Sequence, residues 1–191
     1  LSKKFGNTEK YILNDGFKIH SRLKILKNSD TAEATCSGIS SAIFKMSSYL
    51  NRNRPDMLLI LGDRFEIFSC AVAAMINRIP IGHIHGGELT YGVIDDTLRH
   101  SITKMSKFHF VSHENYRKRV IQLGEDPKKV FCVGALAMDN IYGLKLYSKD
   151  TLLKKYKIKT NKKLALVTFH PVTKNNLNYN NTYPVQEHIF Y

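Results

Sequence analysis

Residues 58–110 decide the fold of this chain and read LLILGDRFEIFSCAVAAMINRIPIGHIHGGELTYGVIDDTLRHSITKMSKFHF. Short apolar runs at 58–61, 79–84 and 108–111 have the character of buried strands, and the apolar residues of 65–75 recur at helical spacing. Strands of this kind, alternating with helices, are typical of a parallel sheet that is buried on both faces. The sequence therefore predicts an α/β fold built on a Rossmann-like parallel sheet.

The flanking sequence extends the same alternation of helices and strands. Asp30 and Glu33 have the spacing of a capping box and predict a helix that runs to about residue 50. Beyond the central stretch, Ser112 is the predicted N-cap of a helix over 113–123, and Gly124 fits the position that ends it. Further predicted elements are a strand at 130–133, helices at 135–146 and 149–156, and a strand at 164–168.

These elements divide into two domains joined by a basic connector. Residues 1–148 are predicted to be an incomplete N-terminal Rossmann-like domain, and 149–163 the connector. Residues 164–191 are the predicted start of a truncated second Rossmann-like domain. Within it, 174–191 is rich in Asn and has no helical or alternating period, so we expect an irregular segment. We expect the chain to be truncated both before Leu1 and after Thr173.

The composition of the 191 residues argues against a membrane or secreted protein. No apolar run approaches the roughly 20 residues that cross a bilayer, and the first residues, LSKKFGNTEKY, lack the apolar core of a signal peptide. Cys36, Cys70 and Cys132 are widely spaced without a CxxC pair, and we predict buried, reduced thiols. We therefore expect a cytoplasmic protein with no membrane partner.

The net charge of +13 raises nucleic acid as a partner, but the distribution of the charge argues against it. Eight lysines fall between Lys145 and Lys163, on a predicted surface helix and connector, while the strand ends carry charges of both signs. A solvated basic face is the favoured interpretation. No nucleic-acid partner is expected, and the excess charge would suit an anionic small molecule such as a nucleotide.

Chemically capable side chains gather where two of the predicted strands end. Asp63 follows the strand at 58–61, and Glu88 follows the strand at 79–84. The carboxyl ends of parallel strands meet at one edge of the sheet, where open α/β sheets bind their ligands. His83 and His85 are two residues apart, so we expect their side chains to point the same way. The pair Gly86-Gly87 allows the backbone to approach a ligand closely.

The next predicted helix brings further charged groups to this edge. Asp95 and Asp96 open it, and Arg99 lies one turn on. Taken alone, Asp95 and Arg99 form a common (i, i+4) surface pair, and Gly-Asp after a strand is an ordinary turn. The candidate site rests on the convergence of these residues with His85 and Glu88. A carboxylate and an imidazole in one pocket can move protons near neutral pH, and a guanidinium can hold a phosphate.

Six segments in unbroken order resemble a known family, the UDP-N-acetylglucosamine 2-epimerases, and within it the hydrolysing branch of bacterial sialic acid or legionaminic acid biosynthesis. The resemblance covers about residues 1–173. The segments are DGF from Asp15, PDMLLILGDRFE from Pro55, RIPIGHIHGGE from Arg78, IDDTLRHSITKMS from Ile94, QLGE from Gln122 and LVTFHPVT from Leu166. Six ordered segments are far more specific than any one of them.

The resemblance implies a glycosyltransferase-B-like fold of two Rossmann-like domains with a UDP-sugar bound between them. It implies elimination of UDP to give a 2-acetamidoglucal, then addition of water to release N-acetylmannosamine, with no cofactor, no metal and a homo-oligomeric enzyme. Position by position, the resemblance implies the catalytic residues Asp63, Asp95 and Asp96 and the substrate-binding residues Arg99 and His170. His85 and Glu88 complete the catalytic candidates, and Gly86 and Gly87 are substrate-binding candidates because their backbone can approach a ligand closely. Several relatives carry Glu where this chain has His85, so the acid/base role either falls to that imidazole or moves to Glu88.

Three alternatives remain open on the sequence. An epimerase of the same branch can act on a UDP-diacetamido-trideoxy sugar for legionaminic acid. The chain can instead be an inactive truncated fragment, because a site assembled between two domains loses its effective molarity when one is absent. A metal-dependent phosphoesterase is suggested by Gly62-Asp63 and the GHIH sequence at 82–85. That family also needs an upstream Asp-x-His strand and a GNH-type motif, which this sequence lacks.

Overall fold

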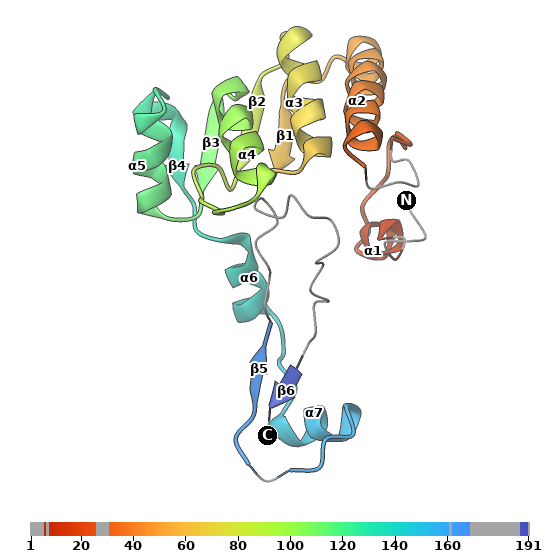
Figure 1. Ribbon diagram of the computed structural model, residues 1–191, viewed down its shortest axis with the longest axis vertical. Coiled ribbons are helices and arrows are strands. Elements are labelled where there is room, and N and C mark those ends of the chain that lie inside the picture. Colours follow the sequence, from red (N-terminus) through yellow and green to blue (C-terminus); the bar gives the residue numbers. More distant parts are fainter. Residues whose placement is uncertain (1–5, 7, 26–30, 161, 169–187, 191) are drawn as a thin grey trace. The chain divides into compact units, whose positions relative to one another are not determined.

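The computed structural model describes residues 6, 8–25, 31–160, 162–168 and 188–190 (Figure 1). The chain separates into two compact units. The first consists of Leu1–Leu89 and Asp95–Gly134, and the second of Thr90–Ile94 and Ala135–Tyr191. The domain bounds expected from the sequence, 1–148, 149–163 and 164–191, stay a prediction.

The first unit is built on a four-stranded sheet in which all strands run parallel. β1 (Leu58–Leu61), β2 (Ile81–Ile84), β3 (Phe108–Val111) and β4 (Val130–Cys132) lie in that order. The helices are α1 (Glu9–Asn14), α2 (Ala32–Asn53), α3 (Phe65–Ile76), α4 (Ile94–Met105) and α5 (Glu114–Gln122), with a 3₁₀ helix, η2 (Pro127–Lys129), before β4. The predicted α/β fold with a parallel sheet is confirmed, whereas α1 was not predicted.

The helix ends differ from the sequence prediction at two N-caps. Thr31, not Asp30, caps α2, and its side chain accepts a hydrogen bond from the amide three residues on; Asp30 lies outside the described residues. His113, not Ser112, caps α5, because the Ser112 hydroxyl donates to a carboxylate across the sheet instead. Gly124 follows α5 at φ +93°, so its predicted role at the helix end is confirmed. Among the described residues, no helix is both long and apolar enough to cross a bilayer.

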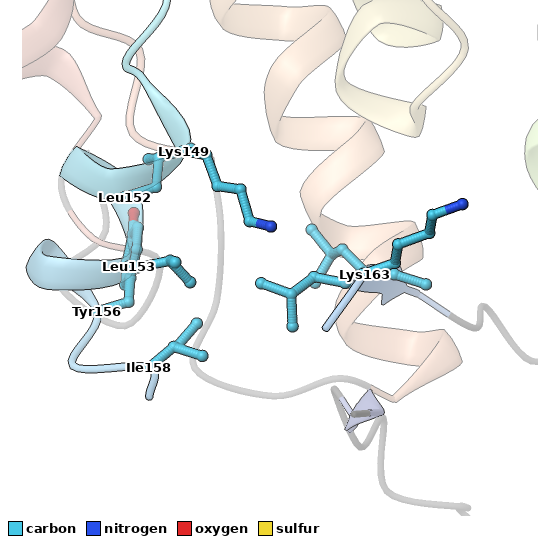
Figure 2. A pocket seen from close by; sticks show the side chains of 9 residues that line it. Lys149, Leu152, Leu153, Tyr156, Ile158 and Lys163 are labelled. Carbon is cyan, nitrogen blue, oxygen red and sulfur yellow. The ribbon is translucent and has the colours of Figure 1, made fainter. Parts of the chain in front are cut away.

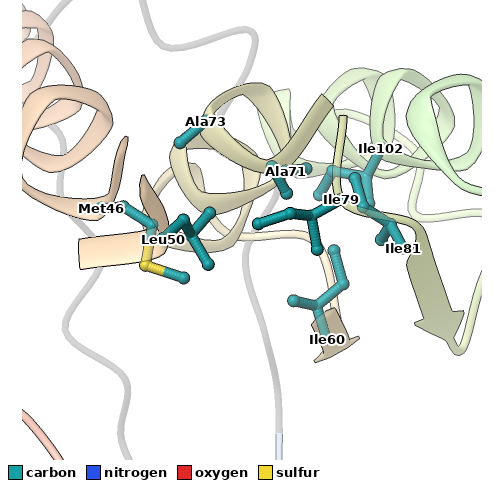
Figure 3. Packing of buried hydrophobic residues seen from close by; sticks show 9 residues of the cluster. Met46, Leu50, Ile60, Ala71, Ala73, Ile79, Ile81 and Ile102 are labelled. Atoms are coloured by element: carbon teal, nitrogen blue, oxygen red, sulfur yellow. The ribbon is translucent and has the colours of Figure 1, made fainter. Parts of the chain in front are cut away.

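The main core lies between the sheet and the helices on one of its faces (Figure 3). Its buried members, in chain order, are Met46, Leu50, Ile60, Ala71, Ala73, Ala74, Ile79, Ile81 and Ile102. Leu50 of α2 and Ile102 of α4 are fully buried in it. The alanines of α3 are small, so this helix can approach both α2 and the sheet closely. A second cluster, Val111, Val120 and Val130, seals α5 against β3 and β4.

Among the residues that the structure describes, apolar side chains on the other face of the sheet remain exposed. Each strand pairs with the next one in sequence, and right-handed crossovers then place α3, α4 and α5 on the same face. Leu59 and Leu61 of β1 and Phe131 and Val133 at β4 point away from these helices, and each is 43–55% exposed. We call these four residues the open sheet face. The prediction that the strand at 58–61 is buried on both faces is therefore wrong in this structure.

The second unit contains α6 (Leu136–Gly143), α7 (Lys149–Lys155) and a two-stranded sheet of β5 (Ala165–Val167) and β6 (His188–Phe190). β5 pairs antiparallel with β6, although the sequence predicted the first strand of a parallel sheet. The predicted irregularity of 174–191 is wrong for His188–Phe190, the part of that segment that the structure describes. All eight lysines from Lys145 to Lys163 are exposed, as expected for a solvated basic face.

A hollow of about 1080 Å³ lies between α7 and β5 (Figure 2). It is lined by Lys149, Leu152, Leu153, Tyr156, Ile158, Lys163, Leu164, Ala165 and Leu166. Leu153 and Ile158 point toward it in Figure 2. The lining is mostly apolar and includes no carboxylate or imidazole, so this hollow offers no acid/base chemistry.

The three cysteines are free thiols, but the prediction that they are buried is wrong for two of them. Cys36 and Cys132 are exposed, and Cys70 is half-buried. Cys36 lies on the outward side of α2, and Cys132 ends β4 at the edge of the sheet. Burial raises the pKa of the Cys70 thiol, and the nearby Glu66 carboxylate adds to that shift.

The packing of α2 on the core can be tested with two leucines of different exposure. Leu50→Ala should lower the free energy of unfolding by about 2–5 kcal/mol, because it leaves a cavity in a fully buried site. Leu59→Ala removes the same atoms from the open sheet face and should change stability by less than about 1 kcal/mol. Urea unfolding of both variants measures the difference, and equal losses would contradict the described core.

Candidate active site

Arg99 of α4 joins the segments that carry the candidate residues. Its guanidinium forms an ion pair with the Asp63 carboxylate, just past β1, and donates a hydrogen bond of 2.9 Å to the Glu88 carbonyl oxygen. The Asp96 carboxylate lies 3.5 Å from the same guanidinium. The Arg99 side chain is only 7% exposed. The structure thus brings Asp63, Glu88 and Asp96 together around one buried cation.

Asp95 does not form the common (i, i+4) surface pair with Arg99, because the guanidinium turns toward Asp63 and Asp96 instead. Asp95 lies half-buried in the first turn of α4. Among the described residues, its carboxylate has no ion pair or hydrogen bond. A carboxylate at a helix N-terminus is stabilised by the helix dipole. The Asp95 carboxylate therefore lies near the site and is available to a ligand.

Glu88 is held by two donors that reach the same carboxylate oxygen. Ser112, at the end of β3, donates its hydroxyl to Oε1 at 2.7 Å, and His85 Nδ1 lies 2.6 Å from Oε1. Burial tends to raise the pKa of Glu88, but the hydrogen bonds from His85 and Ser112 outweigh it, and the pKa is lowered. Glu88 is therefore a carboxylate at neutral pH. Its other oxygen, Oε2, has no hydrogen-bond partner among the described residues.

His83 and His85 do not point the same way, contrary to the sequence prediction. β2 ends at Ile84, and His85 adopts a left-handed conformation with φ +64°, which is uncommon for a residue with a side chain. Its imidazole turns to Glu88 and is 24% exposed. His83 remains in the strand and is fully buried on the helix-covered face. Such strained backbone clusters at functional sites.

The imidazole of His83 bridges two other segments of the site. Its Nε2 lies 2.9 Å from the Gly62 carbonyl oxygen, and its Nδ1 lies 3.3 Å from the Thr103 hydroxyl of α4. Burial lowers the pKa of His83 to about 4, although the hydrogen bond to Gly62 opposes the shift. His83 is therefore a neutral imidazole at physiological pH.

The glycine pair is required by packing. A Cβ on Gly87, which has φ +78°, would lie 2.6 Å from the Tyr116 carbonyl oxygen of α5. A Cβ on Gly86 would lie 3.1 Å from both His83 Nδ1 and Thr103 Oγ1. The close approach that the sequence predicted is therefore made to α5 and to His83. Contact of either glycine with a substrate stays a prediction.

Three residues that contribute to this site were not predicted from the sequence. Ser112 was assigned to a helix cap, although its place at the end of a strand was a usable signal. Arg119 of α5 donates to the Gly87 carbonyl oxygen, and Thr103 contacts His83; neither has a signal in the sequence. His170, predicted to bind substrate, lies outside the described residues. Within the described residues, no group of three or more His, Cys, Asp or Glu side chains could hold a metal ion.

Comparisons with known proteins agree with the ordered segments of the sequence. A family model described as UDP-N-acetylglucosamine 2-epimerase matches residues 1–183. The chain is 45% identical over 182 residues to the GDP/UDP-N,N′-diacetylbacillosamine 2-epimerase (hydrolyzing) of Campylobacter jejuni, covering 95% of this chain and 46% of that protein. It is 43% identical over 169 residues to polysialic acid biosynthesis protein P7 of Escherichia coli, covering 88% of this chain and 43% of that protein.

The fold is also similar to solved structures. The crystal structure of UDP-GlcNAc 2-epimerase from Neisseria meningitidis bound to UDP-GlcNAc superposes with a TM-score of 0.68 at 21% identity. The match covers 80% of this chain and 43% of that chain. The chain therefore spans a little under half the length of these relatives.

The buried neutral imidazole of His83 predicts a pH-dependent stability. Its folded pKa of about 4 lies below the ordinary value of 6.5, so below pH 6.5 the unfolded chain binds a proton more readily. The stability is complete above pH 6.5 and declines as the pH falls toward 4, by up to about 3 kcal/mol. Urea unfolding of the wild type between pH 7 and 4 should show this loss, and His83→Gln should show a shallower one. Identical slopes would refute the assignment to His83.

The contribution to stability of the tight contact between Gly87 and α5 can be separated from that of the Gly87 backbone conformation. Gly87→Ala should destabilise the chain by more than Gly134→Ala, by about 1–3 kcal/mol, since overpacking a rigid backbone contact adds that much. Both glycines have φ near +80°, but a Cβ on Gly134 would meet nothing within 4 Å. Thermal unfolding of the two variants compares them. Equal destabilisation would mean that the loop does not pack on α5 as described.

Proposed function

Because this chain belongs to the UDP-N-acetylglucosamine 2-epimerase family, we propose that the whole protein cleaves a UDP-linked 2-acetamido sugar and releases UDP and the 2-epimeric free sugar. The observation that supports this most is the joining of Asp63, Glu88 and Arg99 at the carboxyl edge of the sheet. Two carboxylates are fixed there on a rigid scaffold, where parallel sheets bind ligands. Carboxylates at this edge can remove and deliver protons in two successive steps.

The proposed chemistry needs one proton acceptor and one proton donor. In the elimination, a base takes the proton from C2 of the sugar, the C1–C2 double bond forms, and UDP leaves with the electrons of the C1–O bond. In the hydration, the oxygen of water adds to C1 and a proton adds to C2 on the opposite face. The product is the 2-epimer, and no oxidant or reductant is required.

We assign the base role to Glu88 rather than to His85. The lowered pKa of Glu88 keeps it ionised, and its Oε2 remains open while Oε1 is anchored by His85 and Ser112. His85 Nδ1 is engaged with Glu88, so this imidazole orients the carboxylate. Asp95, which has no partner among the described residues, is the proposed second proton carrier.

Arg99 acts in this proposal through Asp63. Its guanidinium is almost fully buried and already contacts Asp63, Asp96 and the Glu88 carbonyl oxygen. The Arg99 guanidinium could bind the diphosphate of the substrate directly only if these contacts broke. We therefore assign Arg99 to hold Asp63 and its turn in place. Asp96 provides a second carboxylate beside the Arg99 guanidinium. The direct substrate contact proposed for His170 comes from the family resemblance, and those proposed for Gly86 and Gly87 come from the close backbone approach that glycine allows.

The sugar itself is proposed from the relatives. The identity of 45% to the Campylobacter jejuni enzyme supports UDP-N,N′-diacetylbacillosamine as the first substrate to test. The 43% identity to the Escherichia coli polysialic acid biosynthesis protein supports a sialic acid route as the alternative. The 32% identity to a UDP-N-acetylglucosamine 2-epimerase of Neisseria meningitidis supports UDP-N-acetylglucosamine as the substrate of that route. The two sugars differ at C4 and C6, so a direct competition between them distinguishes the routes. We place the reaction in the cytoplasm, where UDP-sugars are made, and in a homo-oligomer.

The proposed function can be tested in a chimera in which this chain replaces the matching segment of the Campylobacter jejuni relative. The chimera should release UDP and the 2-epimeric sugar. Glu88→Gln and Asp63→Asn should each lower kcat by about 10²–10⁴, because each removes one charge and keeps the shape. Glu114→Gln, on the exposed side of α5, is the matched control and should leave kcat unchanged. Sugar stereochemistry by NMR and UDP release give the two readouts.

Two outcomes would count against this assignment. Full specific activity in the Glu88→Gln chimera would remove Glu88 from the chemistry. UDP release that stops with a chelator and returns with Mn²⁺, without formation of the 2-epimer, would favour the metal-dependent phosphoesterase instead.

A further inference from the structure

We propose that His83 is a positioning residue of this site, whose imidazole holds the Gly62 carbonyl and the Thr103 hydroxyl together and so fixes the Asp63–Arg99 pair relative to Glu88. The proposal rests on the proposed function for its catalytic consequence. Its structural part concerns this chain alone.

Three segments of the site meet at this imidazole. The Gly62 carbonyl belongs to the turn that presents Asp63, and it lies 2.9 Å from His83 Nε2. The Thr103 hydroxyl lies on α4, one turn beyond Arg99, and contacts Nδ1 at 3.3 Å. The strand that carries His83 continues directly into His85 and Glu88. The imidazole ring of His83 therefore fixes the distances between the turn that carries Asp63, the part of α4 that carries Arg99, and the segment that carries Glu88.

The chemistry of the partners determines the form of the ring. A carbonyl oxygen can only accept, so His83 Nε2 must carry the proton that it donates to Gly62. In the neutral ring Nδ1 is then an acceptor, and the single proton of the Thr103 hydroxyl is shared between Nδ1 and the Arg99 carbonyl oxygen. The same hydroxyl also lies 3.1 Å from the Arg99 carbonyl oxygen. Thr103 thus connects the ring to the backbone of Arg99 itself.

The packing around His83 limits which other side chains position 83 can accept. The ring is fully buried, and a Cβ on the neighbouring Gly86 would already be 3.1 Å from Nδ1. A leucine would fill similar space but would leave the Gly62 carbonyl and the Thr103 hydroxyl without their partner. Leaving buried polar groups unsatisfied favours movement of the turn or of α4. Either movement would shift Asp63 against Arg99.

His109 offers a matched comparison within the same sheet. It lies beside His83 in the register of β2 and β3, on the same face, and is equally buried. Its Nε2 contacts Glu125 at 3.2 Å, and it has no hydrogen bond to Gly62 or Thr103. His109→Leu therefore removes a buried imidazole from this sheet without touching the proposed linkage.

The first experiment is NMR on the 191-residue chain labelled with ¹⁵N. Long-range proton–nitrogen correlations should show His83 as the neutral Nε2–H form at pH 7. The Arg99 side-chain NH groups should exchange slowly with water because of the ion pair with Asp63. His83→Leu should speed that exchange by at least about tenfold in a folded chain, since local opening governs it. His83→Gln, which places an amide NH near Nε2, should restore the slow exchange, and His109→Leu should not change it.

Several results would overturn the proposal. One is a charged His83, or the Nδ1–H form, in the wild type at pH 7. A second is unchanged Arg99 exchange in folded His83→Leu, and a third is an equal effect of His109→Leu. If His83→Leu fails to fold, the pair His83→Gln and His83→Asn decides. Asn reaches only the Nδ1 side, so Gln should keep Arg99 protected and Asn should not; equal behaviour of the two would refute the linkage.

The catalytic consequence is measured in the chimera. His83→Leu should lower kcat by up to about 10²-fold with KM changed little, because misplacing the catalytic groups slows chemistry more than binding. His83→Gln should recover most of the rate. A wild-type chimera without turnover would refute the proposed function, while the NMR results would still decide the role of His83. An unchanged kcat in an active His83→Leu chimera would refute that role.

Discussion

The ion pair between Asp63 and Arg99 joins the end of β1 to α4, and the candidate site depends on it. Arg99 is almost fully buried, so its charge needs a partner at close range. Asp63 provides the partner from the turn after β1, and the Glu88 carbonyl oxygen accepts from the same guanidinium. Breaking such a buried pair by removing one partner costs about 3–5 kcal/mol. The same interaction that stabilises α4 on the sheet therefore also sets the position of Asp63.

The polar groups around this ion pair are of two kinds, which differ in their hydrogen bonds and in their exposure. Ser112 and His85 occupy one oxygen of Glu88 and leave the other open. His83 and Thr103 are closed off from solvent and contact backbone or each other. Buried groups whose hydrogen-bonding atoms all have partners fix the positions of their neighbours. Half-exposed groups with an oxygen that has no hydrogen-bond partner can exchange protons with a ligand. The proposed roles of Glu88 and Asp95 on one side, and His83 and Arg99 on the other, follow this division.

The open sheet face shows a different constraint. Parallel sheets are normally covered by helices on both faces, because their strands are continuous apolar runs that present apolar side chains to both sides. Here α3, α4 and α5 all cover one face, and Leu59, Leu61, Phe131 and Val133 remain about half exposed on the other. The chain spans 46% of its Campylobacter jejuni relative.

The sequence by itself determined the order and type of the elements in the first unit. The apolar runs at 58–61, 79–84 and 108–111 and the helical spacing between them were sufficient, because burial in a parallel sheet demands continuous apolar residues. It also predicted that Asp63, His85, Glu88 and Asp95 lie at one edge of the sheet, since parallel strands end together. Only the tertiary structure decided which side chains meet. His85 leaves the strand through a left-handed backbone conformation, Ser112 turns to Glu88 instead of capping α5, and Arg99 selects Asp63 over Asp95. These choices depend on contacts between residues that are 24 and 36 positions apart, and on desolvation, neither of which local spacing in a sequence records.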